Sequence, residues 1–101
     1  MVQPIQIYLG KPQKEKLVVC DVQQGKQITV KQLMFNNSLD TEQKVVITLN
    51  TIDIMTTKVK SGDDVRDTFI VLNPGDKLLI QQETENAVNV MINGVSEQVM
   101  Y

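Results

Sequence analysis

The residue types that carry out most enzyme chemistry are scarce in this sequence. Its 101 residues include no histidine and one cysteine. Histidine is the commonest general base and the commonest ligand of transition metals, so neither a Ser-His nor a Cys-His nucleophile pair can be built. Cys20 lies in the apolar stretch LVVC, where it can serve as a small buried hydrophobic residue, and it has no partner for an intramolecular disulfide. We therefore expect no catalytic residues and no enzyme activity.

Acidic residues are the next candidates, as ligands of a hard cation or as paired acids. Asp63 and Asp64 lie together in SGDD, but a calcium site needs six or more oxygens and the stretch lacks the spacing of an EF-hand loop. We expect these two residues to lie in a solvated turn. Asp53 is flanked by isoleucines and is expected to face outward, so no pair of carboxyl groups for glycoside hydrolysis is predicted. We expect neither a metal nor a cofactor.

Two glycine-containing stretches, VQQGKQITV (22–30) and LNPGDKLLI (72–80), share one pattern. Neither contains the GxxxxGK[ST] or GxGxxG run that would cradle a phosphate. Pro74 and Gly75 suit the centre of a type II turn, because proline presets φ and glycine accepts the positive φ that follows. Both stretches are therefore predicted to be turns that lead into core strands at tight corners.

Aromatic side chains could line a carbohydrate site, but the sequence offers few. Tryptophan is absent, and the aromatic residues are Tyr8, Phe35, Phe69 and Tyr101. Phe35 and Phe69 fall in predicted strands, where burial in the core is expected. A sugar site would therefore need Tyr8 or Tyr101 beside converging amides of asparagine and glutamine. A carbohydrate-binding module stays open as the alternative function.

Charge and hydropathy exclude further classes of partner. The net charge is −2, and the ten lysine and arginine residues are dispersed along the chain, so we expect no nucleic acid partner. No stretch approaches the ~18 to 20 apolar residues that cross a bilayer. The start, MVQPIQIYLG, has neither the basic region nor the unbroken apolar region of a signal peptide. We expect synthesis in a cytoplasm and no membrane partner.

Alternation of apolar and polar residues predicts a series of short strands. The predicted strands cover 5–9, 16–22, 27–35, 44–49, 52–55, 67–72, 76–82, 87–94 and 95–101. Eight or nine such strands, rich in Val, Ile and Thr, are typical of an all-β, single-domain antiparallel β-sandwich over residues 1–101, with little or no helix. An immunoglobulin-like and a jelly-roll-like strand order both remain open.

Several local features refine this prediction. Ile28 and Val30 would face away from Leu33 and Phe35 unless a β-bulge near Lys31 shifts the register. A change of phase between residues 49 and 52 indicates a bend or a crossing between sheets. The polar stretch 59–67 is predicted to be a loop, and residues 67–94 are predicted to form a meander. The uncharged stretch IQIYL (5–9) is the predicted edge strand.

The same alternation assigns side chains to the core or to the surface. The predicted core consists of Val30, Val45, Ile47, Leu49, Ile70, Leu72, Leu78, Ile80, Val88, Val90 and Ile92. The apolar residues predicted to face outward are Val46, Leu79, Ala87 and Met91. A contiguous exposed apolar patch would mark an interface. Val46, Leu79 and Met91 are therefore the predicted contacts with a protein partner.

Three segments in order resemble a known group of proteins: GKQITVKQLMFNNSLDTEQKVVITL, DTFIVLNPGDKLLI and NAVNVMINGVSE. Together they resemble small β-sandwich proteins in the virions of tailed bacteriophages. The matching positions are Gly25, Lys26, Asn36, Asn37, Pro74, Gly75, Asp76, Ala87, Val88, Asn89, Val90, Gly94 and Val95. The resemblance spans residues 22–97 and departs from the group's Val-Glu ending at Ser96.

This resemblance implies a non-catalytic structural component of the virion, made in the host cytoplasm. The component would decorate the head or belong to the neck or tail. Its partners would be copies of itself and other virion proteins.

Overall fold

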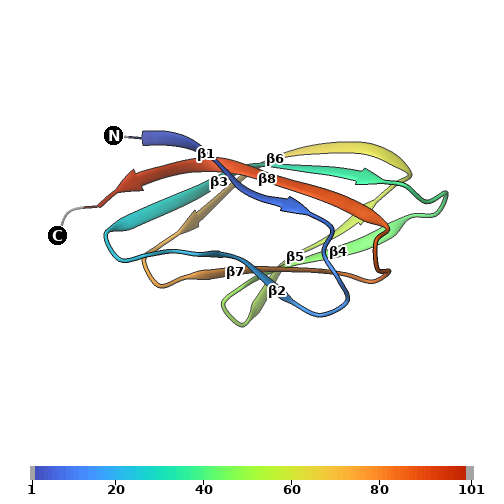
Figure 1. Ribbon diagram of the computed structural model, residues 1–101, viewed down its shortest axis with the longest axis horizontal. Helices are drawn as coiled ribbons and strands as arrows, with labels where there is room; N and C mark the ends of the chain where they lie inside the picture. Colours follow the sequence, from blue (N-terminus) through green and yellow to red (C-terminus); the bar gives the residue numbers. More distant parts are fainter. Residues whose placement is uncertain (1, 100–101) are drawn as a thin grey trace.

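Eight β-strands follow one another in the computed structural model, which describes residues 2–99. They are β1 (Val2–Gly10), β2 (Leu17–Asp21), β3 (Lys26–Asn37), β4 (Gln43–Leu49), β5 (Ile52–Val59), β6 (Gly62–Leu72), β7 (Lys77–Gln82) and β8 (Val88–Gln98). All pairings are antiparallel, and the strands form two stacked four-stranded sheets (Figure 1). Residues 2–99 contain no helix. The predicted all-β sandwich of about eight strands is confirmed.

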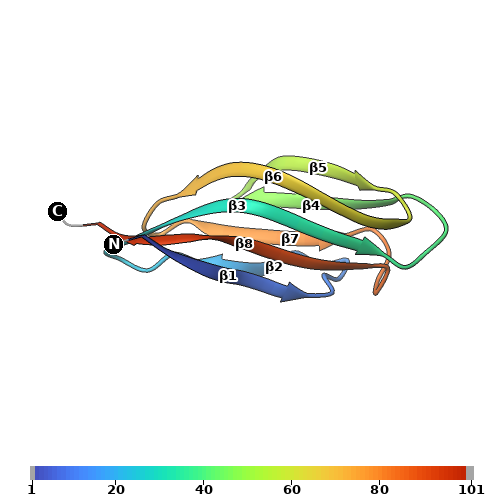
Figure 2. The ribbon, with the colours of Figure 1, turned by 90° about the horizontal axis from the view of Figure 1, so that it is seen from above.

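The two sheets arise from one long hairpin that is rolled up. Strand β1 pairs with β8, β2 with β7, β3 with β6 and β4 with β5. Rolling places them in sheet A, of order β1-β8-β3-β6, and sheet B, of order β2-β7-β4-β5. Figure 2 shows the strands of sheet A side by side. An immunoglobulin sandwich would pair its first two strands with each other, so this order is that of a jelly roll.

This order corrects two predictions for the second half of the chain. The meander over residues 67–94 is wrong, because β6 and β8 lie in sheet A whereas β7 lies in sheet B. The separate closing strand over 95–101 is also wrong, because β8 runs without a break to Gln98. Residues 100–101 of that predicted strand lie outside the described residues.

The two glycine turns lie at equivalent points of the long hairpin, where the chain passes between the sheets. Residues 23–26 join β2 to β3, and residues 73–76 join β6 to β7. In each turn the fourth amide donates to the first carbonyl, at 3.2 and 3.0 Å respectively. Gly25 and Gly75 occupy the third positions with φ of 82° and 89°, which confirms the positive φ predicted for Gly75.

The turns are also bonded to each other. The Gly75 amide donates to the Val22 carbonyl at 2.9 Å, and the Val22 amide donates to the Asp76 carbonyl at 3.0 Å. The similarity of the two stretches therefore has a structural cause, since the same corner is turned twice on adjacent segments of backbone.

The predicted irregularities of β3 and β4 have different outcomes. The bulge near Lys31 is confirmed, because the register of β3 shifts between Val30 and Gln32 against both of its neighbours. The phase change after Leu49 is a tight hairpin and not a crossing, since Leu49 pairs with Ile52 within sheet B.

The predicted loop over residues 59–67 is wrong. Strand β5 continues to Val59 and β6 begins at Gly62, so two residues carry the chain from sheet B to sheet A. Polar residues are tolerated in this strand because β6 is an edge strand whose outer face meets water.

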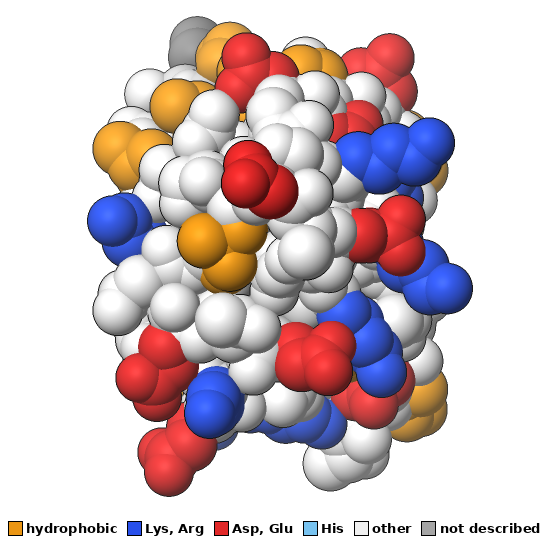
Figure 3. All heavy atoms as spheres, turned by 90° about the vertical axis from the view of Figure 1, so that its right-hand side faces the viewer, with side chains coloured by type: hydrophobic (Ala, Val, Ile, Leu, Met, Phe, Trp, Pro, Cys, Tyr) orange, Lys and Arg blue, Asp and Glu red, His pale blue; other side chains and the backbone are white. Residues whose placement is uncertain are grey.

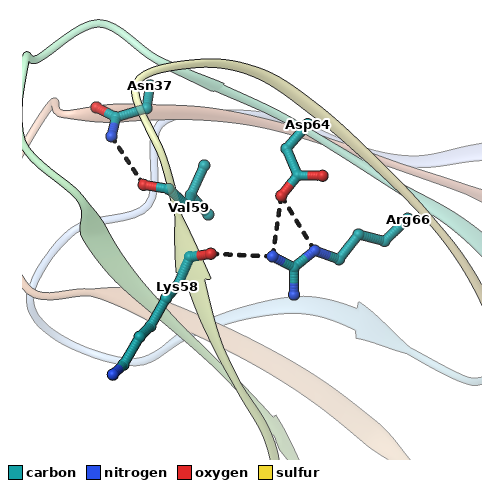
Figure 4. A network of polar contacts seen from close by, with 5 residues as sticks. All are labelled: Asn37, Lys58, Val59, Asp64 and Arg66. Atoms are coloured by element: carbon teal, nitrogen blue, oxygen red, sulfur yellow. Dashed lines mark hydrogen bonds and ion pairs between the residues drawn. The ribbon is translucent and has the colours of Figure 1, made fainter.

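Polar side-chain contacts stabilise this crossing (Figure 4). Arg66 donates to the Asp64 carboxylate through Nη2 and Nε at 2.9 and 3.1 Å, and its Nη2 also donates to the Lys58 carbonyl at 2.9 Å. The buried Asn37 side chain donates to the Val59 carbonyl at 2.9 Å. Asp64 is therefore paired within a strand, and not part of a solvated turn as predicted.

The core lies between the two sheets and matches most of the prediction. Nine of the eleven predicted residues are buried, whereas Leu49 and Ile70 are half-buried and pack against the others. The predicted list of core residues leaves out five buried apolar residues: Val22, Leu33, Phe35, Val59 and Ala87. The burial predicted for Phe35 from its place in a strand is confirmed.

Two side chains lie opposite to their predicted positions. Ala87 was predicted to face outward but is 2% exposed, because it precedes β8 and the alternation of that strand does not apply to it. Phe69 was predicted to be buried but is 71% exposed. The alternation of β6 directs Ile70 and Leu72 inward, which leaves Phe69 on the outer face, where Lys31 Nζ lies 4.5 Å from its ring centroid.

Replacing Ile47 with alanine should lower the free energy of unfolding by ~2 to 5 kcal/mol, because the fully buried side chain would leave a cavity. Urea denaturation measures this loss. Val46→Ala, on the opposite face of the same strand, is the control and should cost clearly less. A loss below about half a kcal/mol for Ile47→Ala would contradict the position of the core.

Replacing Gly75 with alanine should destabilise the fold by ~1 to 2 kcal/mol, because alanine is strained at positive φ. An added Cβ would meet nothing within 4 Å, so the loss would report backbone strain alone. Gly75→Asn is the matched control and should lose less, since asparagine tolerates this conformation better. An alanine variant as stable as the wild type in thermal unfolding would contradict the turn type.

Candidate interaction surface

The outer face of sheet A carries an apolar row that crosses all four strands. Antiparallel register places Leu9 of β1 beside Met91 of β8, Met91 beside Met34 of β3, and Met34 beside Val65 of β6. Leu9 is 64% exposed and Val65 is 54% exposed, whereas Met91 is half-buried. We call these four side chains the apolar row.

A polar row follows the apolar row on the side of the loop between β3 and β4. It contains Asn89, Asn36 and Asp63, which are paired across β8, β3 and β6. Asn89 Nδ2 donates to Asn36 Oδ1 at 3.3 Å, and Asn36 Nδ2 donates to Asp63 Oδ1 at 2.6 Å. We call these residues the first amide row.

A second amide row flanks the apolar row on its other side. It consists of Gln6, Asn93, Gln32 and Asp67, one from each strand. Asn93 Nδ2 lies 3.4 Å from Gln32 Oε1 and 3.3 Å from Met91 Sδ. The outer face of sheet A is therefore an apolar band between two bands of amides.

The apolar row and the first amide row line a shallow groove of about 310 Å³. Phe35 and Val90 also line it, although both side chains are buried in the core. Asp63 is the one charged residue that lines this groove. Its shape and apolar lining suit contact with another apolar surface.

The three predicted contact residues do not form one patch. Met91 lies in the apolar row on sheet A. Val46 and Leu79 lie on the outer face of sheet B, because their neighbours in the same strands point into the core. The two outer faces are on opposite sides of the sandwich, and all three side chains are half-buried.

Sequence reasoning missed the other three members of the apolar row. Met34 lies between the buried Leu33 and Phe35, so alternation after the bulge could have placed it outside. Val65 lies in the stretch predicted to be a loop, to which the alternation of a strand was not applied. Leu9 was assigned to the edge strand, but its side of the sheet had no signal in the sequence.

An ion pair, and not a reactive site, accounts for Asp53 on the outer face of sheet B. Thr48 Oγ1 donates to Asp53 Oδ1 at 2.7 Å, and Lys16 Nζ lies 3.0 Å from the same oxygen. The hydrogen bond from Thr48, followed by that from Lys16, holds the pKa of Asp53 below its usual value. Asp53 is exposed, as predicted.

The other candidate residues lie apart from the groove. Burial, with Asp21 beside it, raises the pKa of the Cys20 thiol and keeps it protonated at neutral pH. Tyr8 packs against the core, which raises the pKa of its phenol, and it does not line the groove. Tyr101 lies outside the described residues.

Three further features of the described part of the molecule concern metal ligands, membrane spans and charge. Within residues 2–99, no three His, Cys, Asp or Glu side chains are grouped so that they could hold a metal ion. The described part of the chain has no helix long and apolar enough to span a membrane. Figure 3 shows acidic and basic side chains interspersed at one end of the sandwich, without a continuous basic patch on that face.

Comparison of the sequence with known protein families and with curated proteins found no match.

Thr48→Val should raise the pKa of Asp53 towards the ordinary aspartate value of ~3.9, because the strongest hydrogen bond to its carboxylate is lost. Since the folded pKa is lowered, the stability that this carboxylate confers is present above the ordinary value and is lost as pH falls through the folded value. NMR titration of the carboxyl carbon measures the shift. Thr56→Val, on the exposed outer side of β5, is the control and should leave the pKa of Asp53 unchanged.

Proposed function

We propose that this protein is a non-catalytic structural component of a tailed-phage particle, which acts through contacts with copies of itself and with other virion proteins. The observation that carries this proposal is the apolar row on the outer face of sheet A. The resemblance of residues 22–97 to small virion sandwiches gives the class of particle.

An apolar row on an outer face is expected to be covered by another protein surface. An antiparallel sheet with one face on the core usually presents polar side chains to water on its other face. Here Leu9 and Val65 are more than half exposed, and Phe69 projects from the same face. Contiguous exposed apolar side chains rimmed by polar ones are typical of protein interfaces. A structural role is the simplest use of such a face.

The free edge of sheet A offers a second place for contact. Strand β1 is an edge strand, as predicted for residues 5–9, and it contains no charged residue. Edge strands are usually protected by charges, proline or bulges, and β1 has Pro4 and a register shift near Ile7. The opposite edge, β6, carries three aspartates and an arginine. Another virion protein would therefore find less charge along β1.

A carbohydrate-binding module is the second candidate, supported by the first amide row. Asn36, Asn89 and Asp63 offer donors and acceptors suited to sugar hydroxyls at the rim of the groove. The groove has no exposed aromatic ring on which a sugar could stack, since its one aromatic residue, Phe35, is buried. This candidate is therefore the weaker of the two.

The test of the proposed function is the composition of purified particles. An antibody or a small tag on the chain should detect it in intact particles of a phage that carries the gene, and quantitative mass spectrometry should give a fixed copy number. Hundreds of copies would indicate head decoration, whereas a few to a few dozen would indicate the neck or tail.

Two outcomes would contradict the proposal. Particles that lack the chain after gradient purification would exclude a virion component. Specific binding on a glycan array, abolished by Asn36→Ala and by Asn89→Ala, would favour the carbohydrate-binding module.

A further inference from the structure

We infer that the outer face of sheet A binds the same face of a second copy of this chain, forming a dimer whose two-fold axis runs along the strands between β8 and β3. This inference rests on the proposed function and names its first partner. It follows from the size of the face, from the order of its rows and from the positions of its charges.

The face is large enough for a stable dimer. Four strands at a spacing of ~4.8 Å, with about eleven residues rising ~3.3 Å each, make a face of about 700 Å². Two such faces would bury about 1,400 Å² in total, within the range of ~1,200 to 2,000 Å² for specific interfaces. Stacked sheets of two copies would repeat the packing that already joins sheets A and B.

A two-fold axis along the strands places the apolar row of one copy over the apolar row of the other. This rotation places β8 of one copy over β3 of the other, and β1 over β6. Met91 then meets Met34 of the other copy, and Leu9 meets Val65. Both apolar rows are covered along their whole length, and flexible methionines at the centre can adjust to each other.

The amide rows are also self-complementary under this rotation. Asn89 of one copy faces Asn36 of the other, and Asn93 faces Gln32. Each amide carries both donors and an acceptor, so like residues can bond to each other. In the next row, beyond the second amide row, Val71 of one copy lies over Pro4 of the other. These two residues share a row because Val71 pairs with Thr29, Thr29 with Val95, and Val95 with Pro4. The exposed Phe69 ring lies beside this contact.

The charges select this axis over the other simple choice. A two-fold axis across the strands would place the first amide row over the second, so that Asp63 would meet Asp67 of the other copy at the β6 edge. Facing like charges are unfavourable. With the axis along the strands, both aspartates lie beside the uncharged β1 edge of the other copy, at the rim of the contact where water still reaches them.

Sheet B offers no comparable face. Its outer surface carries the Lys16–Asp53 ion pair and Lys44 among its apolar side chains. Stacking two such faces would remove Lys44, on the central strand β4, from water, which is costly. The dimer is therefore assigned to sheet A alone.

Sedimentation of the purified chain tests the dimer. The wild type should dimerise with a Kd on the order of 1 μM, at the weak end for this area. Val65→Asp and Leu9→Asp should each weaken dimerisation at least ~100-fold, because each introduces two buried charges per dimer. Leu79→Asp, on sheet B, is the matched control and should keep the wild-type affinity. Circular dichroism and urea midpoints identify variants that have lost the fold. One sheet A variant that keeps the fold is enough to test the dimer.

Crosslinking tests the axis. In a Cys20→Ser background, a mixture of Leu9→Cys and Val65→Cys chains should crosslink with a short bismaleimide much faster than either variant alone, because this axis places β1 over β6 and leaves like positions about 14 Å apart across the sheet. Equal crosslinking of each variant with itself would overturn the axis.

Other outcomes separate the dimer from the proposed function. A wild-type chain that stays monomeric at about 1 mM, or sheet A variants that dimerise as well as the wild type, would overturn the dimer. If such a monomer is still found in particles, the proposed function stands and another virion protein covers the face. A dimer that is absent from particles would overturn the proposed function alone.

Discussion

Each sheet of this protein has one apolar face, and the removal of both faces from water is the constraint on which the rest of the structure depends. The bulge at Lys31 shows how strictly it acts. Without the bulge, Val30 and Leu33 would lie on opposite faces of sheet A, and one of them would be exposed. One extra residue restores the alternation, and both side chains become fully buried. The glycine turns serve the same constraint, because they fold one sheet onto the other.

The core determines which residues of sheet A point outward, but it does not determine whether those residues are polar or apolar. Because Leu33 and Phe35 point inward, residue 34 must point outward, and the same holds for residue 91 between Val90 and Ile92. Nothing in the core requires methionine at these two positions, and polar residues would suit a solvated face equally well. The amides on either side show that the chain uses polar residues on this face. The apolar row is therefore best explained by a contact outside the monomer.

Local patterns in the sequence predict the features that depend on neighbouring residues. Alternation predicts most strands and most of the core, the mismatch around Lys31 predicts the bulge, and Pro74-Gly75 predicts a positive φ. The strand at residues 62–67 could not be predicted in this way. Its charges have partners that include residues distant in the sequence, such as the Asn36 amide that donates to Asp63, so its polarity resembles that of a loop.

The candidate surface was harder to predict because it depends on strand order. Val46, Leu79 and Met91 share the property of facing away from the core, but local alternation cannot assign them to a sheet. Only the pairing of β8 between β1 and β3 brings Met91 beside Leu9 and Met34. The jelly-roll order itself arises from pairings between residues far apart in the chain, for which the sequence holds no short-range signal.

The rolled hairpin also determines how the chain can fold. Of the strand pairs in the rolled hairpin, only β4–β5 is closed by a tight turn, whereas each further pair encloses a longer stretch of chain, and β1 must wait for β8. Closing long loops costs entropy before their contacts can compensate, so chains with such topology fold slowly. Pairing should start at β4–β5 and proceed towards the two ends. On a ribosome, sheet A would remain incomplete until the last strand has emerged, and its central position between β1 and β3 would be filled last.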